Sequence, residues 1–129
     1  LKKKDGILAI AIYNDQGLKS NFWKVIKKSY NSSFLLSLLI KMAFIPVFTV
    51  GYILYGIIFH KSPFWSFINY KKSRGMDLYY DWVDWLGGYP YEVAKPEKII
   101  RFFLKKEFIL MNLITTNSLG CNQYLFSTR

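Results

Sequence analysis

The chain has very little of the residue types that make most functional sites recognisable. It contains one cysteine, Cys121, and one histidine, His60, among 129 residues. A lone cysteine excludes an internal disulfide and makes a reducing compartment the default. The sequence has no cysteine–histidine spacing typical of zinc, no Walker loop and no Ser-His-Asp arrangement. We therefore predict no metal site, and disulfide scaffolds and P-loop enzymes are excluded.

Acidic side chains are also scarce: 8 Asp and Glu stand against 18 Lys and Arg, for a formal net charge of +10. A field of this sign attracts nucleic acid or anionic lipid. We favour a lipid surface and no nucleic acid, because the basic clusters flank the most apolar stretch and no groove-reading motif is present. The alternative is that the lysines only solvate helix faces. The basic clusters are Lys2–Lys4, Lys24, Lys27, Lys28, Lys71, Lys72, Arg74 and the segment Lys95–Lys106.

Charge is nearly absent from one long stretch, where Lys41 is the only formally charged residue between Ser29 and His60. Its second half, residues 42–60, approaches the roughly 20 apolar residues that a membrane-spanning helix needs. Pro46 and two glycines interrupt it, which predicts one or two helices broken near Pro46. Both flanks are basic, so charge gives no orientation, and no signal-peptide pattern is present. We favour a buried or interfacial helical cap, and a true span stays the alternative.

The first regular element is an isoleucine-rich run, GILAIAIY, over residues 6–13. A continuous apolar run of this length predicts a strand buried on both faces of a parallel sheet. The run ends in a polar turn. Because ligands of doubly wound sheets bind beyond the carboxyl ends of strands, we expect Asn14, Asp15 and Gln16 to point at a site.

Further periodic segments complete an α/β pattern. Residues 20–30 predict a helix with Lys24, Lys27 and Lys28 on its polar side, and residues 96–106 predict one that begins at Pro96. Residues 76–86 predict a short helix, and residues 109–116 and 124–128 predict strands. The whole chain, 1–129, is expected to form a single partial domain: an inner strand (6–13), a helical insert or cap (20–70), and carboxyl-terminal helices with a strand hairpin (76–129).

The short helix at residues 76–86 concentrates acids and aromatics. Asp77, Asp81 and Asp84 share one face, and Trp82 and Trp85 lie on another. Three aspartates on a face are either solvated or part of a site, and the tryptophans either pack in a core or wall a pocket. Gly87 and Gly88 follow, in the place where a helix commonly ends.

Four segments in order carry a resemblance. The first is Lys4-Asp5-Gly6 before the isoleucine-rich strand, and the second is RGMDLYYDWVDWLGGYPYEVA over residues 74–94. The third is the Pro-initiated helix leading to Phe108, and the fourth runs from Thr115 to Tyr124. Together they resemble the carboxyl-terminal part of class I S-adenosylmethionine-dependent methyltransferases of the quinone-ring methylase-like group, from the fifth strand to the seventh.

The resemblance implies a doubly wound, Rossmann-like sheet, here one parallel strand plus a carboxyl-terminal hairpin, with an apolar helical insert. It implies methyl transfer from S-adenosyl-L-methionine to an apolar or membrane-associated small molecule, in the cytoplasm or peripherally at a membrane. The cofactor's glycine-rich turn is absent, so its binding residues are expected upstream of Leu1 and this piece alone is expected to be inactive. The expected catalytic residues are Asp81 and Asp84, and the expected substrate-binding residues are Tyr13, Asn14, Asp15, Gln16, Trp82, Trp85, Tyr89 and Glu92.

Three positions depart from the family's pattern. Lys95 occupies a helix N-cap where Ser, Thr or Asp is expected. Glu107 stands where such helices usually end in glycine, and Tyr80 replaces a common histidine. These departures suggest a drifted or marginally stable member. The alternative function is a small, basic, membrane-anchored protein without enzymatic activity, and the sequence does not fix the oligomeric state.

Overall fold

The structure is a computed structural model that describes residues 6–128. The described residues form two compact units, one from residues 6–24 with 91–128 and the other from Val25–Pro90. We call them the sheet unit and the helical unit. The boundary falls inside helix α1 (Leu18–Tyr30), which contributes residues to both. The basic cluster Lys2–Lys4 and the Lys4-Asp5 part of the first resembling segment lie outside the described residues.

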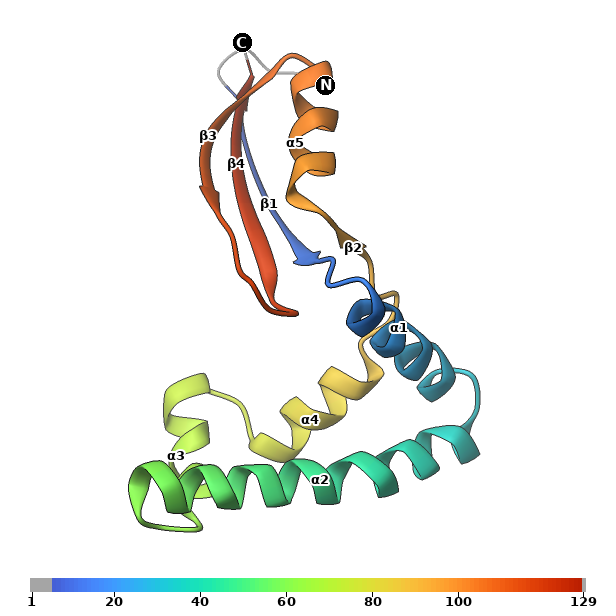
Figure 1. The fold of residues 1–129 in the computed structure, drawn as a ribbon, viewed down its shortest axis with the longest axis vertical. Helices are drawn as coiled ribbons and strands as arrows, with labels where there is room; N and C mark the ends of the chain where they lie inside the picture. Colours follow the sequence, from blue (N-terminus) through green and yellow to red (C-terminus); the bar gives the residue numbers. More distant parts are fainter. Residues whose placement is uncertain (1–5, 129) are drawn as a thin grey trace. The chain divides into compact units, whose positions relative to one another are not determined.

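The sheet unit contains a four-stranded mixed sheet in the order β2-β1-β4-β3 (Figure 1). Strand β1 (Ile7–Asn14) runs antiparallel to β4 (Cys121–Thr128), and β4 runs antiparallel to β3 (Phe108–Ile114). A bulge between Leu110 and Asn112 shifts the β3–β4 register. On the other edge of β1, the two-residue strand β2 (Val93–Ala94) pairs in parallel. The α/β class, the first strand and the final hairpin are as predicted.

One face of this sheet holds the core of the unit. The register places Leu8, Ile10 and Ile12 of β1 opposite Phe126, Tyr124 and Asn122 of β4, and those three β4 residues are buried. Helix α5 (Pro96–Lys105) covers this face, with Phe103 4.7 Å from Phe126 between ring centroids.

The opposite face is bare, which corrects the expectation that β1 is buried on both faces. Along β1 exposed and half-buried residues alternate, and Ile7 is 75% exposed. Ala11 of β1 and Ile114 of β3 are exposed as well. The physical reason is that the described residues place a helix over only one face of the sheet, so the apolar run has cover on only one side.

Both predicted irregularities of α5 are confirmed. Lys95 is its N-cap, with extended backbone and no side-chain hydrogen bond to the first turn. Glu107, just after the helix, has a φ of 62°, the left-handed region that favours glycine.

The helical unit contains α2 (Phe34–His60), α3 (Trp65–Arg74), α4 (Leu78–Gly87) and the last part of α1. Helix α2 is one continuous helix of 27 residues, so the predicted break near Pro46 is wrong. Pro46 lies on an exposed side of the helix. Ser33 caps the start, where its side chain accepts the Leu36 N–H at 3.2 Å.

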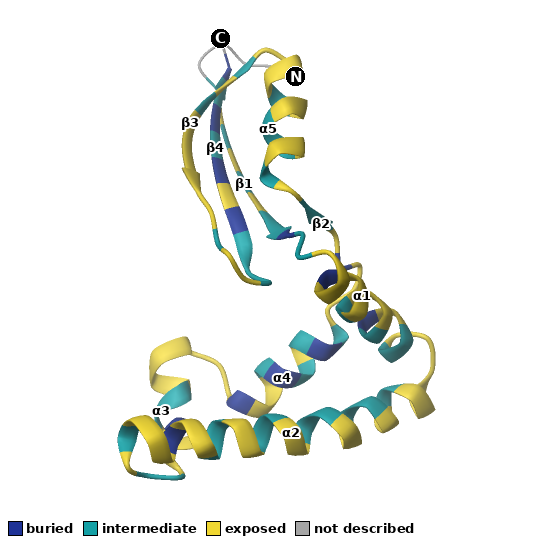
Figure 2. Ribbon diagram, in the orientation of Figure 1, coloured by how far each residue is buried: buried dark blue, intermediate teal, exposed yellow. Residues whose placement is uncertain are grey.

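Trp82 of α4 is the centre of the helical unit's core. Its ring lies 5.7 Å from Phe48 and 5.4 Å from Tyr52, both on α2, and 6.3 Å from Phe67 on α3. The turn from α2 to α3 passes directly over Gly56, where an added Cβ would lie 2.4 Å from the Ser62 carbonyl oxygen. Figure 2 shows the result: a buried and half-buried stripe along α2, with most of the helix surface exposed.

Candidate functional site

At the carboxyl end of β1, Asn14 is buried and its side chain is fully engaged. Its amide nitrogen donates to the carbonyl oxygens of Thr116 at 2.8 Å and Ser118 at 3.3 Å. Its amide oxygen accepts from Asn122 at 3.1 Å, and the Asn122 oxygen accepts the Thr116 N–H at 2.9 Å. Asn14 therefore holds the turn between β3 and β4 in place beside the end of β1.

The next residues form a turn fixed by its own side chains. The Asp15 carboxylate accepts the Gly17 N–H at 2.8 Å, and Gly17 has a φ of 61° that suits glycine. The Gln16 N–H donates to the hydroxyl of buried Ser20 at 2.8 Å, and that hydroxyl donates to the Asn14 carbonyl at 3.4 Å. The Asp15 side chain and the Gln16 backbone are thus held at the end of the strand, and both residues are half-buried.

Tyrosines form the wall of this end of the sheet. The rings of Tyr13 and Tyr91 lie 4.9 Å apart and are tilted by 50°. Tyr91 is buried, and this burial raises the pKa of its hydroxyl. Glu92 follows it and is exposed, one residue before Val93 pairs with Tyr13. Five predicted site residues therefore lie around one strand end: Tyr13, Asn14, Asp15, Gln16 and Glu92. Their binding roles stay predictions.

The other predicted residues belong to the helical unit, on or just after α4. Asp77 caps the helix by accepting the Tyr79 N–H at 3.1 Å. Asp84 and Tyr89 are exposed, and Trp85 is half-buried. Trp82 packs in the aromatic core described above, so its observed contacts are those of a packing residue. The catalytic roles predicted for Asp81 and Asp84 stay predictions.

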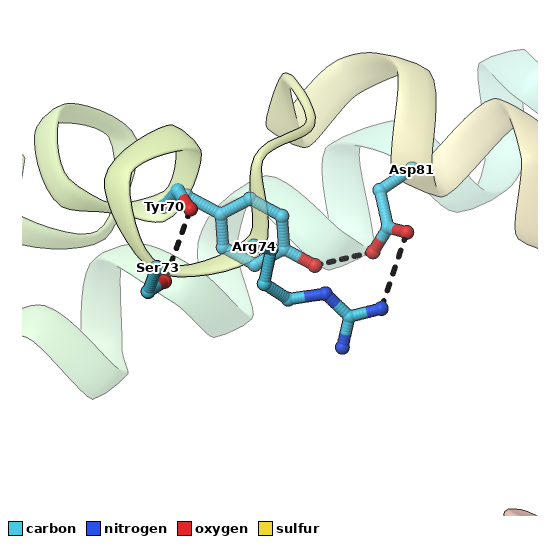
Figure 3. Close-up of polar contacts among 4 residues, drawn as sticks. All are labelled: Tyr70, Ser73, Arg74 and Asp81. Carbon is cyan, nitrogen blue, oxygen red and sulfur yellow. Dashed lines mark hydrogen bonds and ion pairs between the residues drawn. The ribbon is translucent and has the colours of Figure 1, made fainter.

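Asp81 is bound on both oxygens (Figure 3). The Tyr70 hydroxyl donates to one, and the Arg74 guanidinium lies 3.5 Å from the other. Burial, followed by the bond to Asp81, raises the pKa of Tyr70. Tyr70 therefore stays a protonated donor at neutral pH. The cluster fastens α3 to α4.

Beside this cluster, α2 and α3 enclose an open groove of about 450 Å³, a size typical of small-molecule sites. Ser66 lines it, and the Ser66 hydroxyl is buried with no hydrogen-bond partner among residues 6–128. The groove was not predicted, because it depends on how two helices pack. Its principal side chains are Tyr52, Tyr55, Trp65, Ser66, Tyr70 and Ser73.

Lys27 was also missed, since the sequence placed it on a solvated helix side. It is only 2% exposed. Its ammonium donates to the Trp85 carbonyl and lies 4.1 Å from the centre of the Trp85 ring. Burial lowers the pKa of Lys27 to about 8, an effect that the negative charge of Asp84 partly offsets. Asn31, one turn later, donates to the Gly87 carbonyl at 2.9 Å, so α1 caps the carboxyl end of α4.

Residues 6–128 contain neither a cluster of metal-ligating side chains nor a glycine-rich cofactor turn. No three His, Cys, Asp or Glu side chains gather within it as ligands. Gly17 stands alone after β1, so residues 6–128 contain no glycine-rich turn between a strand and a helix. Cys121 is a half-buried free thiol. No protein-family model, curated protein or solved structure matches this chain.

Proposed function

We propose that this chain forms the substrate-side, carboxyl-terminal part of a class I S-adenosylmethionine-dependent methyltransferase acting on an apolar or membrane-associated small molecule. The supporting observation is the order of three strands. The resemblance equates β1, β3 and β4 with the fifth, sixth and seventh strands of that fold. The last strand, β4, lies between the other two and runs antiparallel to both, and with β3 it forms the carboxyl-terminal hairpin that the resemblance implies.

The unpaired parts of the sheet support the same proposal. On the edge away from β4, only Tyr13 and Asn14 of β1 pair with another strand. The preceding backbone groups of β1, from Ile7 to Ile12, have no strand partner on that side among the described residues. An apolar strand with a free edge is a template for a further strand. The bare face, with Ala11 and Ile114, likewise suits helices of a larger two-faced sheet.

Within this proposal, the residues at the end of β1 face the methyl acceptor. Tyr13 provides an aromatic wall, and Asp15 and Glu92 are the carboxylates available to orient the acceptor or accept its proton. Asp81 is a poorer base, because its oxygens already bind Tyr70 and Arg74. Asp84 is exposed, and its carboxylate lies near the Lys27 charge.

The described residues do not fit the cofactor itself. The carboxylate that follows β1, Asp15, already accepts the Gly17 N–H of its own turn, and residues 6–128 contain no glycine-rich turn between a strand and a helix. When bound, S-adenosylmethionine supplies a methyl group that is carried on a positively charged sulfur. A lone pair of the acceptor forms a bond to this methyl group, and the bond from the methyl group to sulfur breaks to leave a neutral thioether. The proposal assigns residues 6–128 to the acceptor side only.

Calorimetric titration with S-adenosylmethionine tests the enzyme. The proposal expects a longer polypeptide, in which these residues follow a cofactor-binding part, and this polypeptide should bind S-adenosylmethionine. In the same polypeptide, Glu92→Gln should lower the rate of methyl transfer without changing the affinity for the cofactor. Absence of binding by that longer polypeptide would remove the proposal. The 129 residues alone are expected to bind weakly or not at all, and micromolar affinity from them would contradict the assigned division of labour.

Helix α2 favours a second candidate, a small, basic, membrane-anchored protein without enzymatic activity. The helix has 27 residues, and by length and apolar composition it could cross a membrane. Two measurements distinguish the candidates: carbonate extraction from membranes and binding of S-adenosylmethionine. The anchored protein would resist carbonate extraction, and even the longer polypeptide would bind no S-adenosylmethionine.

A further inference from the structure

Helix α2 has two sides with different surroundings (Figure 2). On one side, Phe48 and Tyr52 pack against Trp82, and Gly56 is covered by the turn into α3. The other side is apolar along the whole helix and exposed. We call it the bare side of α2, and its residues include Leu35, Met42, Val47, Val50, Leu54 and Ile58.

The bare side carries no charge. The only charged residue within α2, Lys41, is half-buried, and its ammonium lies 5.8 Å from the centre of the Tyr30 ring of α1. It therefore points toward another helix of the same unit. A surface helix of a water-exposed protein normally keeps its polar residues on the outer side. Here the apolar residues occupy that side, so the helix suits an apolar medium.

The packed side decides how α2 can meet a bilayer. Helices α3 and α4 lie against it and carry Lys71, Lys72 and the Arg74–Asp81 ion pair. A transmembrane α2 would draw these charges into the hydrocarbon, where each is strongly unfavourable. The helix is also about 40 Å long at 1.5 Å per residue, longer than the hydrocarbon core of about 30 Å. A helix lying in the plane of the interface immerses only its bare side.

The positive charge around α2 favours a bilayer with anionic headgroups. Exposed Lys28 precedes the helix, exposed Lys61 follows it, and α3 adds Lys71, Lys72 and Arg74. The helical unit contains seven Lys and Arg against three Asp. This excess attracts anionic headgroups and repels a second, equally positive copy of the chain. We propose that the bare side of α2 docks in the plane of an anionic lipid bilayer, with α3 and α4 on the aqueous side. The inference rests on the helical unit and is independent of the methyltransferase proposal.

Vesicle sedimentation of the full chain tests this docking. We expect binding to phosphatidylserine-containing vesicles, weaker binding to pure phosphatidylcholine, and release by alkaline carbonate. Val50→Asp on the bare side should lower partitioning about tenfold, because a carboxylate is unfavourable among acyl chains. Met111→Asp, at a similarly exposed apolar position in the sheet unit, is the matched control and should change partitioning by less than about twofold. Circular dichroism confirms that both variants are folded.

Depth is measured independently of these variants. In a Cys121→Ser background, an environment-sensitive fluorophore on Val50→Cys should shift to the blue with anionic vesicles, and one on Lys71→Cys should not. Resistance to carbonate, or a blue shift at both positions, would show insertion across the bilayer and overturn the proposal. Absence of vesicle binding, with dimers that Val50→Asp dissociates, would overturn it in favour of self-association.

Discussion

The sheet unit and the helical unit both leave apolar surface exposed, but the two surfaces have different requirements. In the sheet unit the free edge of β1 presents backbone N–H and C=O groups along with exposed Ile7. Such an edge is completed only by another strand. In the helical unit the backbone of α2 is internally hydrogen-bonded, and its bare side presents only apolar side chains. Such a side needs no hydrogen-bonding partner, so lipid can cover it.

The interiors of the two units also differ in the interactions that hold them together. The sheet unit fixes its candidate site through buried amides, in which Asn14 and Asn122 bind each other and the β3–β4 turn. The helical unit depends on aromatic packing around Trp82 and on one buried ammonium, Lys27. Substitutions should therefore separate the units: changes at Trp82 and Lys27 should act on the helical unit, and a change at Glu107 should act on the sheet unit.

The largest expected effect comes from Trp82→Ala. This substitution removes the ring shared by α2, α3 and α4 and should cost the helical unit about 3–5 kcal/mol. Hydrogen exchange should show lost protection in α2 and α4 and unchanged protection in β1 and β4. Tyr80→Ala, on the same helix but 67% exposed, is the control and should cost under about 0.5 kcal/mol. Equal protection in both variants would mean that the helical unit has no core of its own.

The second effect is a pH dependence confined to the helical unit. The pKa of Lys27 is about 8 in the folded chain, below its ordinary 10.5. Below pH 8 both folded and unfolded chains carry the charge, so the full penalty of burying it applies. Between pH 8 and 10.5 the unfolded chain binds more protons, and stability should rise with pH, by about 3 kcal/mol at most.

Lys27→Met should remove this rise, because it keeps the unbranched stem and loses the titrating group. Lys28→Met, at the exposed neighbouring position, should leave the rise intact. Urea midpoints measured between pH 7 and 10.5 give the comparison. A rise that persists in Lys27→Met would assign it to other groups, such as the tyrosines.

The third expected effect is a change in stability on glycine-to-alanine substitution, with opposite signs at two glycines of α2. At Gly56 a methyl group would meet the Ser62 carbonyl oxygen at 2.4 Å, and backbone atoms cannot yield cheaply, so Gly56→Ala should cost about 1–3 kcal/mol. At Gly51 nothing lies within 4 Å, so Gly51→Ala should gain up to about 1 kcal/mol from helix propensity. Thermal unfolding of the two variants measures both. Effects of the same sign would contradict the tight turn from α2 into α3.

Local chemistry was enough to predict much of the fold. The isoleucine-rich run, Pro96 at a helix start and the final hairpin all lie where pattern and turn residues place them. The resemblance also pointed to the unusual backbone of Glu107, since the helices it implies usually end in glycine at this position. These local features are determined by residues only a few positions apart in the chain, and such short-range patterns can be recognised in the sequence.

What the sequence did not show depends on contacts between distant segments. Asn14 was predicted to face a ligand, and its partner Asn122 lies 108 residues away. Lys27 has the periodicity of a solvated lysine, and only the docking of α1 on the end of α4 buries it. The break predicted near Pro46 rested on the general tendency of proline to break a helix interior. In the structure α2 runs continuously through Pro46, with Phe48 and Tyr52 packed on Trp82 and Gly56 covered by the turn into α3.

The smallest expected effect belongs to the sheet unit. Glu107→Gly should stabilise it by about 1 kcal/mol, because glycine adopts a φ of 62° without the steric cost that a Cβ brings. Hydrogen exchange of β3 and β4 should slow, and exchange of α2 and α4 should not change. A loss of stability would mean that contacts of the Glu107 side chain outweigh its backbone strain. A gain that reached α4 as well would show that the two units unfold together, and the contrast between them would then hold for their surfaces but not for their stability.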